Sequence, residues 1–399
     1  MTHLQLALLL GATVALSPFA MDAYLPAFPE IAATYGVTTG QVGVTVSIYL
    51  VGLALGHLVG GPLSDRYGRD RVLFAGLAMF IAGSLLVAAS PSFTALAAWR
   101  LVQSVGAGWC MVSVPAIARD HTSGTEGARL FSLIGLVIFI APATAPTIGT
   151  LILTVTGWPG IFAFLAAYAA AVGLLLRLTL FRHWRGRPER RRPLHTVITN
   201  YAEVLDHGTA MRLLAVQSLV FSVMILFITH ASFIFQEWYG LSRAAFSGWM
   251  AAHMVLMGGF NLLNRWLLNY RHPAVVLQAA IAVQAAATCY LTAVAATEPS
   301  LALFLPGMLL AIGAFGAGVP NTFSLFLDFF RDIAATASAL MGAIRFTAAG
   351  LISGFSSLVV GGSLTAVVAM MAGCALAALV LAWGVPGSIE GRARRAGDA

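Results

Sequence analysis

The sequence predicts an all-α membrane protein with twelve transmembrane helices, and three observations support this fold class. Hydrophobic residues make up 59% of the 399 positions and charged residues only 9%, against about 25% charged in ordinary soluble domains. Twelve apolar runs, each long enough to cross a bilayer, follow one another along the chain. The arginines gather in alternate links between these runs. Little of the chain is left for a separate soluble domain.

The apolar runs give the order of the expected helices. A helix needs about 20 apolar residues to span a hydrocarbon core of about 30 Å. The expected spans are 4–26, 42–60, 72–90, 94–117, 129–153, 159–180, 211–235, 244–266, 273–296, 300–326, 334–359 and 363–385. No arginine precedes the first run and no small-residue cleavage site follows it, so we interpret it as a span and not as a secretory signal.

The arginine distribution predicts the orientation of the spans. If the N-terminus is inside, the links that begin at 61, 118, 181, 267, 327 and 386 are cytoplasmic. When residues at the span ends are assigned to the nearer side, 19 of the 22 arginines are cytoplasmic. Only Arg243 falls on the outer side, and Arg100 and Arg345 lie at membrane depth. This agrees with the positive-inside rule and predicts cytoplasmic N- and C-termini. Because the charge is scattered over several loops, we expect no nucleic-acid partner.

The chain is expected to contain two six-helix pseudo-repeats. The expected segments are an N-terminal bundle at 1–180, a cytoplasmic linker at 181–210, a C-terminal bundle at 211–385 and a cytoplasmic tail at 386–399. The linker has a cluster of arginines at 182–192. Each arginine can contribute about 1 kcal/mol to binding of the linker to anionic lipid headgroups. Apolar residues at helical spacing over 194–205 predict a short amphipathic helix on the membrane surface. A regulatory segment and a simple solvated tether are the alternatives.

Two charged residues inside apolar spans are the first functional candidates. A carboxylate such as Asp22 costs several kcal/mol in hydrocarbon when ionised and unpaired, so it is protonated or matched. That property suits a proton carrier, although Asp22 could also meet interfacial water at the outer end of its span. Arg100 cannot release its proton and must find an acceptor or a wet cavity. It could hold a carboxylate ionised, or it could bond to the carbonyls of an adjacent helix.

A charged turn at 60–71 separates two of the apolar runs. Its glycines allow close approach of the helix ends, and Asp65 can pair with an arginine or cap a helix N-terminus. Such contacts can hold one conformation of a two-state protein, or the arginines can serve only to fix orientation.

The fifth span contains Pro142 and Pro146, which lie four residues apart and therefore on the same face of the helix. Each proline removes a backbone hydrogen bond and bends the helix, and Gly149 permits close packing nearby.

Several of these segments resemble signatures of the major facilitator superfamily. The pattern from Gly61 to Arg69, which includes Asp65, Arg66 and Gly68, is similar to the loop between helices 2 and 3. The run from Arg100 to Gly106 resembles the fourth-helix motif Arg-x-x-Gln-x-x-Gly. The segment 141–149 resembles the fifth-helix antiporter motif, with alanine at 141 and 145 where glycine is usual.

At closer range the chain resembles the Bcr/CflA group of drug:proton antiporters. The likeness rests on 21–29 with 61–69, and on Ala118-Arg119-Asp120, the proline pair, Gly157-Trp158 and 335–340. It implies a multi-pass protein of the bacterial inner membrane that expels small drug-like molecules of the chloramphenicol or bicyclomycin type. Alternating access would be driven by the proton gradient, without a cofactor. Asp22 would carry the proton, Arg100 would tune it, and Arg119 and Asp120 would belong to the gate.

The remaining candidates are residues that could face a substrate cavity. They are Tyr24, His57, Trp109, His230 and Arg345. His57 replaces the usual glutamine of the Bcr/CflA group, and His230 could instead be hydrogen-bonded within its bundle.

The sequence gives no sign of a metal site or an enzyme. Three scattered cysteines have no metal spacing, so no metal site is expected. No nucleotide-binding loop or catalytic cluster is present, so an enzyme is not expected. We expect a monomer, and export of an amino acid or other small metabolite is the alternative function.

Overall fold

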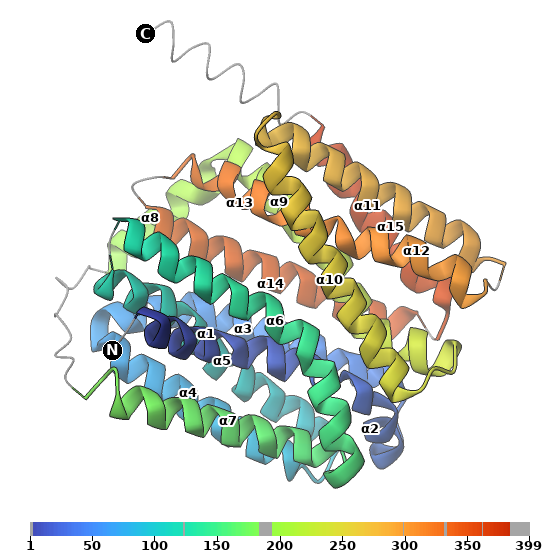
Figure 1. Cartoon of the computed structure of the whole chain (residues 1–399), viewed down its shortest axis with the longest axis horizontal. Coiled ribbons are helices and arrows are strands. Elements are labelled where there is room, and N and C mark those ends of the chain that lie inside the picture. The colour runs from blue at the N-terminus through green and yellow to red at the C-terminus, as the bar shows by residue number, and fades with distance from the viewer. Residues whose placement is uncertain are drawn as a thin grey trace, which may run out of the picture. The chain divides into compact units, whose positions relative to one another are not determined.

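The computed structural model describes residues 3–122, 124–182, 194–297, 299–330, 333–360 and 362–383. The described residues are helical almost throughout, and Figure 1 shows the order of the helices along the chain. Eleven helical segments are long and apolar enough to cross a membrane. The all-α class is thus confirmed. The count of twelve spans stays a prediction, because α10 (Arg243–Leu267), at the expected span 244–266, is not among the eleven.

The chain divides into two units. Unit 1 comprises Met1–Val197 and Gly240–Ala251, and unit 2 comprises Ile198–Tyr239 and Ala252–Ala399. The first residues of α10 therefore group with unit 1 and the rest of that helix with unit 2. The predicted linker and tail fall partly outside the described residues: of the arginine run only Arg182 is described, and it is exposed, while 386–399 is not described.

Unit 1 is built from the helices of the N-terminal half. They are α1 (His3–Asp22), α2 (Phe28–Tyr35), α3 (Thr39–Tyr67), α4 (Arg69–Ala88), α5 (Phe93–His121), α6 (Gly124–Thr156) and α7 (Trp158–Leu178), with a short 3-10 turn, η1 (Leu25–Ala27), after α1. Helix α5 packs against α3 and α4, and α1 packs against α5, α6 and α7. Helices α1 and α5 are therefore central to this unit.

Local sequence explains where these helices begin and end. Gly36 closes α2 in a left-handed conformation at φ 66°, which glycine adopts without strain. Thr38 and Gln41 then form a capping box, in which each side chain bonds to the backbone N–H of the other at 3.2 and 2.8 Å. Ser92 caps α5 through the N–H of Ala95 at 3.2 Å. Such caps satisfy helix-end donors that would otherwise lack partners.

Unit 2 contains the remaining helices. They are α8 (Leu194–Asp206), which begins in unit 1, α9 (Gly208–Ser232) with its π-helical extension η2 (Phe233–Trp238), α11 (Pro273–Ala295), α12 (Leu301–Gly313), α13 (Phe315–Leu327), α14 (Ala334–Val359) and α15 (Leu364–Ala382). Helix α9 packs against α13, α14 and α15. Helix α8 lies at the position of the expected linker helix, and its placement on a membrane surface stays a prediction.

A stripe of glycines brings α3 and α5 into close contact. A methyl group on Gly52 would overlap the Ser104 side chain, and one on Gly56 would lie 2.7 Å from the carbonyl oxygen of Val105. One on Gly60 would lie 2.9 Å from the indole of Trp109. The four-residue spacing places all three glycines on one helical face, where small residues let backbones approach. This approach holds α5, and with it Arg100, against α3.

Candidate functional site

Arg100 lies at the centre of a buried aromatic group in unit 1. It is carried by α5 and has no solvent exposure. Its guanidinium carbon lies 4.4 Å from the ring centroids of both Tyr24 and Tyr49, and 5.6 Å from that of Phe162. Cation–π contacts contribute about 2 kcal/mol when they are desolvated. The rings therefore stabilise a charge that a guanidinium cannot lose inside a membrane.

Hydrogen bonds fix the orientation of Arg100. Its Nη1 donates to the carbonyl oxygen of Ala20 on α1 at 3.0 Å and to Oε1 of Gln103 at 2.7 Å. The Gln103 amide donates in turn to Oγ of Ser84 on α4 at 2.7 Å. The sequence left two alternatives for Arg100, and the bond to Ala20 corresponds to the second, a hydrogen bond to a carbonyl group of an adjacent helix. Its Nε and Nη2 are buried without a hydrogen-bond partner among the described residues, so two donors are left over.

Asp22 is the last residue of α1 and is 5% exposed. Its Oδ1 is buried and accepts no hydrogen bond from any residue that the structure describes. Arg100 reaches the same end of α1 but bonds to Ala20, two residues earlier, and no ion pair joins Arg100 to Asp22 within the described part of the chain. The structure thus brings the two candidates to one helix end without pairing them.

The proline-rich segment of α6 packs directly against the residue that follows Asp22. A methyl group on Gly149 would overlap the carbonyl oxygen of Ala23 and would lie 2.7 Å from its carbonyl carbon. Only glycine permits this approach, so α6 packs closely at Gly149, and its predicted part in the antiporter motif stays a prediction. Pro142 and Pro146 lie inside the same helix. The end of α1 is therefore held by Arg100 on α5 and by the Gly149 contact with α6.

Tyr24 lies just after the end of α1 and belongs to the aromatic group around Arg100. It is fully buried, and its hydroxyl lies 2.8 Å from Oγ1 of Thr45 on α3. Its ring centroid lies 5.1 Å from that of Phe28 and 5.6 Å from that of Phe162. Tyr24, named as a cavity candidate, therefore lies in the core of unit 1.

His57 and Trp109 are half-buried on neighbouring helices. The Nδ1 of His57 lies 2.9 Å from the carbonyl oxygen of Leu53 in the preceding turn of α3. Trp109 packs against Gly60, and its indole Nε1 is buried without a hydrogen-bond partner in the described residues. An unpartnered indole N–H is costly to bury. The structure thus shows a spare donor on Trp109, and its place in a substrate cavity stays a prediction.

The charged turn between α3 and α4 is anchored to the end of α5. Gly68 turns the chain at φ 100°, where an L side chain would be strained. Arg69 then forms an ion pair with Asp120 and donates to the carbonyl oxygen of Ala116 at 2.6 Å. Asp120 is exposed, as is its neighbour Arg119. The turn and the end of α5 therefore form one cluster within unit 1.

The other residues of the predicted gate contribute less visible contacts. Arg66 is exposed and lies 5.4 Å from the ring centroid of Tyr67. A methyl group on Gly61 would meet only an ordinary contact, the Val112 side chain at 3.8 Å. The side chain of Asp65 lies outside the described residues. Its predicted role in the gate stays a prediction.

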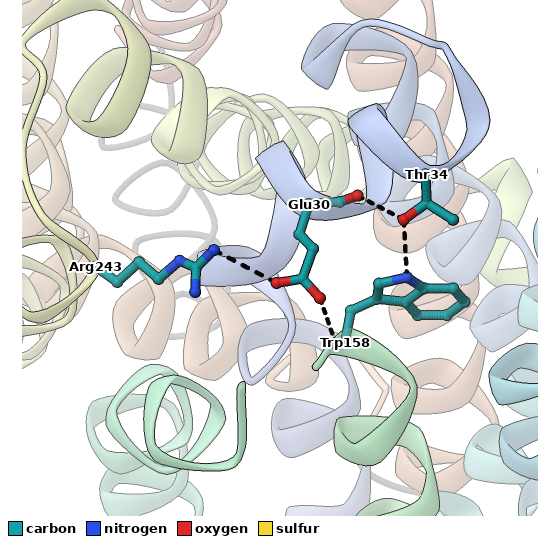
Figure 2. A network of polar contacts seen from close by, with 4 residues as sticks. All are labelled: Glu30, Thr34, Trp158 and Arg243. Carbon is teal, nitrogen blue, oxygen red and sulfur yellow. Dashed lines mark hydrogen bonds and ion pairs between the residues drawn. The ribbon is translucent and has the colours of Figure 1, made fainter. Parts of the chain in front are cut away.

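A second polar network in unit 1 was not found from the sequence, and Figure 2 shows it. Oε1 of Glu30 accepts the backbone N–H of Trp158 at 3.0 Å, and its Oε2 lies 3.4 Å from Nη2 of Arg243. The Trp158 indole donates to Thr34, which donates to the Glu30 carbonyl. Arg243 was noted only as the single outer arginine. The available signal was that Glu30 and Arg243 both fall next to predicted outer links.

Among the described residues of unit 2, His230 has a polar partner and Arg345 has none. His230 is 2% exposed, and its Nε2 lies 2.8 Å from Oγ of Ser356 on α14. This is the alternative of a histidine bonded within its bundle. Arg345 lies on α14, with its guanidinium carbon 4.6 and 4.7 Å from the ring centroids of Phe221 and Phe346. Within the described residues, no group of three or more metal-ligating side chains could hold a metal ion.

Comparison with known proteins decides the family. The Major Facilitator Superfamily model matches residues 10–354. The chain belongs to this superfamily. It is 28% identical over 354 residues to the "Uncharacterized MFS-type transporter YdgK" of Bacillus subtilis, covering 88% of each chain. It is also 28% identical over 370 residues to the "Multidrug resistance protein MdtL" of Shigella flexneri, covering 93% of each chain.

Solved structures agree on the superfamily fold. The structure of a D-xylose-proton symporter matches with a TM-score of 0.76 at 16% identity, covering 94% of this chain and 97% of that one. A bacterial homologue of the lysosomal transporter Spinster matches with a TM-score of 0.72 at 17% identity, covering 95% and 94%. Because the chain belongs to the Major Facilitator Superfamily and has eleven candidate spans among the described residues, it is a multi-span membrane transporter and not an enzyme.

Proposed function

We propose that this superfamily member expels small drug-like molecules across the bacterial inner membrane in exchange for protons, as a member of the Bcr/CflA group. Compounds of the chloramphenicol and bicyclomycin type are the expected substrates. The name of the relative MdtL, a multidrug resistance protein, supports efflux. The proton gradient is the energy source, and no cofactor is required. The predicted cytoplasmic termini, monomeric state and lipid contacts of 182–192 complete the proposal.

The observation that carries this proposal is the isolation of Asp22. Its carboxyl group is buried at the end of α1 with one oxygen unpartnered. An ionised carboxylate there costs several kcal/mol without a partner. Asp22 therefore holds a proton in this state and gives it up when water or a cation reaches it. A group that alternates in this way couples proton entry to substrate release.

Arg100 is proposed to tune this exchange through the backbone. It binds the carbonyl oxygen of Ala20 and keeps two buried donors unpaired. A small change in the end of α1 would bring the carboxylate of Asp22 to those donors, where a charge-assisted pair would stabilise its ionised form. Pro142, Pro146 and Gly149 on α6 form the bent surface against which this end moves. Arg69 and Asp120 hold the turn after α3, as a gate would require.

The second candidate function is proton-coupled export of an amino acid or other small metabolite. The unpaired Arg345 favours it, because a guanidinium in an apolar span suits a substrate with a negative charge. The two functions share the role of Asp22. They differ in the charge of the compound that is carried.

The test is proton release from the purified protein in vesicles when candidate compounds are added. We expect substrate-triggered proton release from the native protein and none from Asp22→Asn. Glu203→Gln is the matched control, because it removes an exposed carboxylate on α8 and should leave proton release unchanged. Coupled efflux that persists in Asp22→Asn would remove Asp22 from the role.

A further inference from the structure

Arg345 is a charged side chain at membrane depth without a polar partner. It is half-buried near the middle of α14, and it makes no hydrogen bond or ion pair with any residue that the structure describes. Its Nε is fully buried. Arginines inside membrane spans normally pair with an acid, a carbonyl group or water. The guanidinium of Arg345 is therefore left for a partner that is not part of the described chain.

Two aromatic rings lie against this guanidinium and leave its N–H groups free for hydrogen bonds. Phe221 and Phe346 lie 4.6 and 4.7 Å from its central carbon, and their rings meet edge to face at 5.6 Å. Phe315 at the start of α13 adds a third ring, 5.9 Å from Phe221. Cation–π contacts use the π face of a ring and leave the N–H groups of arginine available in its plane. The rings also form an apolar wall beside those donors.

Gln217 adds a second unsatisfied group on the facing helix. It lies one turn before Phe221 on α9, which places both side chains on one face of that helix. Gln217 has no exposure, and neither its amide nitrogen nor its amide oxygen has a partner among the described residues. Leaving a buried amide unpaired destabilises a protein by about 1–3 kcal/mol. Such a group is tolerated where a ligand can satisfy it.

The same two helices satisfy their polar groups farther along. Thr229 on α9 lies 2.6 Å from Oγ of Ser353 on α14, and His230 is bonded to Ser356. The α9–α14 interface is therefore able to pair polar side chains. The lack of partners at Gln217 and Arg345 is local to one level of that interface.

We propose that Arg345 and Gln217 form a subsite for a carboxylate group on the transported compound, with the compound's apolar or aromatic body against Phe221, Phe315 and Phe346. The planar fork of arginine matches the two oxygens of a carboxylate, and the Gln217 amide supplies a further donor. This subsite rests on the proposed function, because it assumes that the chain carries small molecules. Among the compounds that the protein carries, the subsite favours acids and zwitterions with an apolar body over their neutral analogues.

The experiment compares an acid with its neutral analogue. Binding of 3-phenylpropanoate and of 3-phenylpropanamide to the purified full-length protein is measured at neutral pH by calorimetry. We expect the native protein to bind the acid more tightly on the order of tenfold, the typical effect of a hydrogen bond to a charged group. Arg345→Gln should reduce this ratio to about one, and Gln217→Leu should lower it in part. Arg265→Gln, which changes an exposed arginine on α10, should leave the ratio unchanged.

Other outcomes separate this subsite from the proposed function. Equal binding of acid and amide by the native protein, or an unchanged ratio in Arg345→Gln, would overturn the subsite. Proton-coupled efflux of neutral drugs could then still be intact. If Arg345→Gln does not fold, the partial loss in Gln217→Leu decides the question. Loss of the acid preference in Arg345→Gln, together with persistent coupling in Asp22→Asn, would support the subsite and remove the proposed proton carrier.

Discussion

Gly149→Ala tests whether the contact between α6 and the end of α1 controls the site. The added methyl carbon would lie 2.7 Å from the carbonyl carbon of Ala23 and would overlap its oxygen. Carbon atoms pack best at about 3.5–4.0 Å, so the two helices must separate locally by roughly 1 Å. Overpacking of this kind destabilises a protein by about 1–3 kcal/mol. A shift of this size beside Asp22 should slow efflux by roughly tenfold to a hundredfold.

Gly135→Ala is the matched control on the same helix. A methyl group at Gly135 would meet no atom within 4 Å, and both substitutions favour the helix by up to about 1 kcal/mol. The difference between the two variants therefore isolates the steric effect. Thermal unfolding and vesicle efflux should show a lower midpoint and slower transport only for Gly149→Ala. Equal behaviour of the two variants would refute the argument that α6 is held against Ala23.

Substitutions at three further contacts give separate predictions. Arg100→Lys should lower the free energy of unfolding by about 1–3 kcal/mol, because an ammonium group cannot stack flat against the two tyrosine rings while it donates to α1. An unchanged unfolding midpoint would contradict this prediction. Arg69→Gln and Asp120→Asn should each reduce transport more than stability. The two side chains are 13% and 30% exposed, and an ion pair that water still reaches contributes only about 0–1 kcal/mol. A double-mutant cycle should show coupling, and strictly additive effects would argue against the pair. Glu30→Ala should destabilise the protein more than Arg243→Ala, because Glu30 also accepts the first N–H of α7. Equal losses in unfolding experiments would count against that role.

Two controls sharpen these measurements. Arg177→Lys changes an exposed arginine on α7 and should leave the free energy of unfolding within about 0.5 kcal/mol of the native value. Arg66→Gln removes an exposed charge from the same turn as Arg69 without breaking the ion pair to Asp120. A transport loss in Arg66→Gln as large as in Arg69→Gln would indicate a general charge effect.

The helices could be read from the sequence because apolar length is a strong signal in membrane proteins. Eleven of the twelve expected runs are found as candidate spans. The exception, α10, carries Arg243 and Arg265 near its ends and polar residues such as Asn261 and Asn264 within it. Hydropathy alone does not decide whether such a helix crosses the membrane. Its division between the two units was also not visible in the sequence.

The candidate site was predictable only in part. Asp22 and Arg100 stand out because charge is rare in apolar runs, and Gly149 because it follows two prolines. The aromatic rings of Tyr49 and Phe162 around Arg100 gave no such signal, since every expected span contains at least one aromatic residue. The choice of Ala20 rather than Asp22 as the partner of Arg100 depends on how α1 and α5 pack. Sequence spacing within either helix does not contain that information.

Infrared difference spectroscopy tests most directly whether Asp22 exchanges a proton during transport. Spectra of the reconstituted native protein and of Asp22→Asn are recorded before and after addition of a transported compound. The account predicts that a protonated-carboxyl band is lost from the native protein on addition and that Asp22→Asn lacks this change. An identical change in both proteins, or no change in the native protein while it transports, would contradict the account.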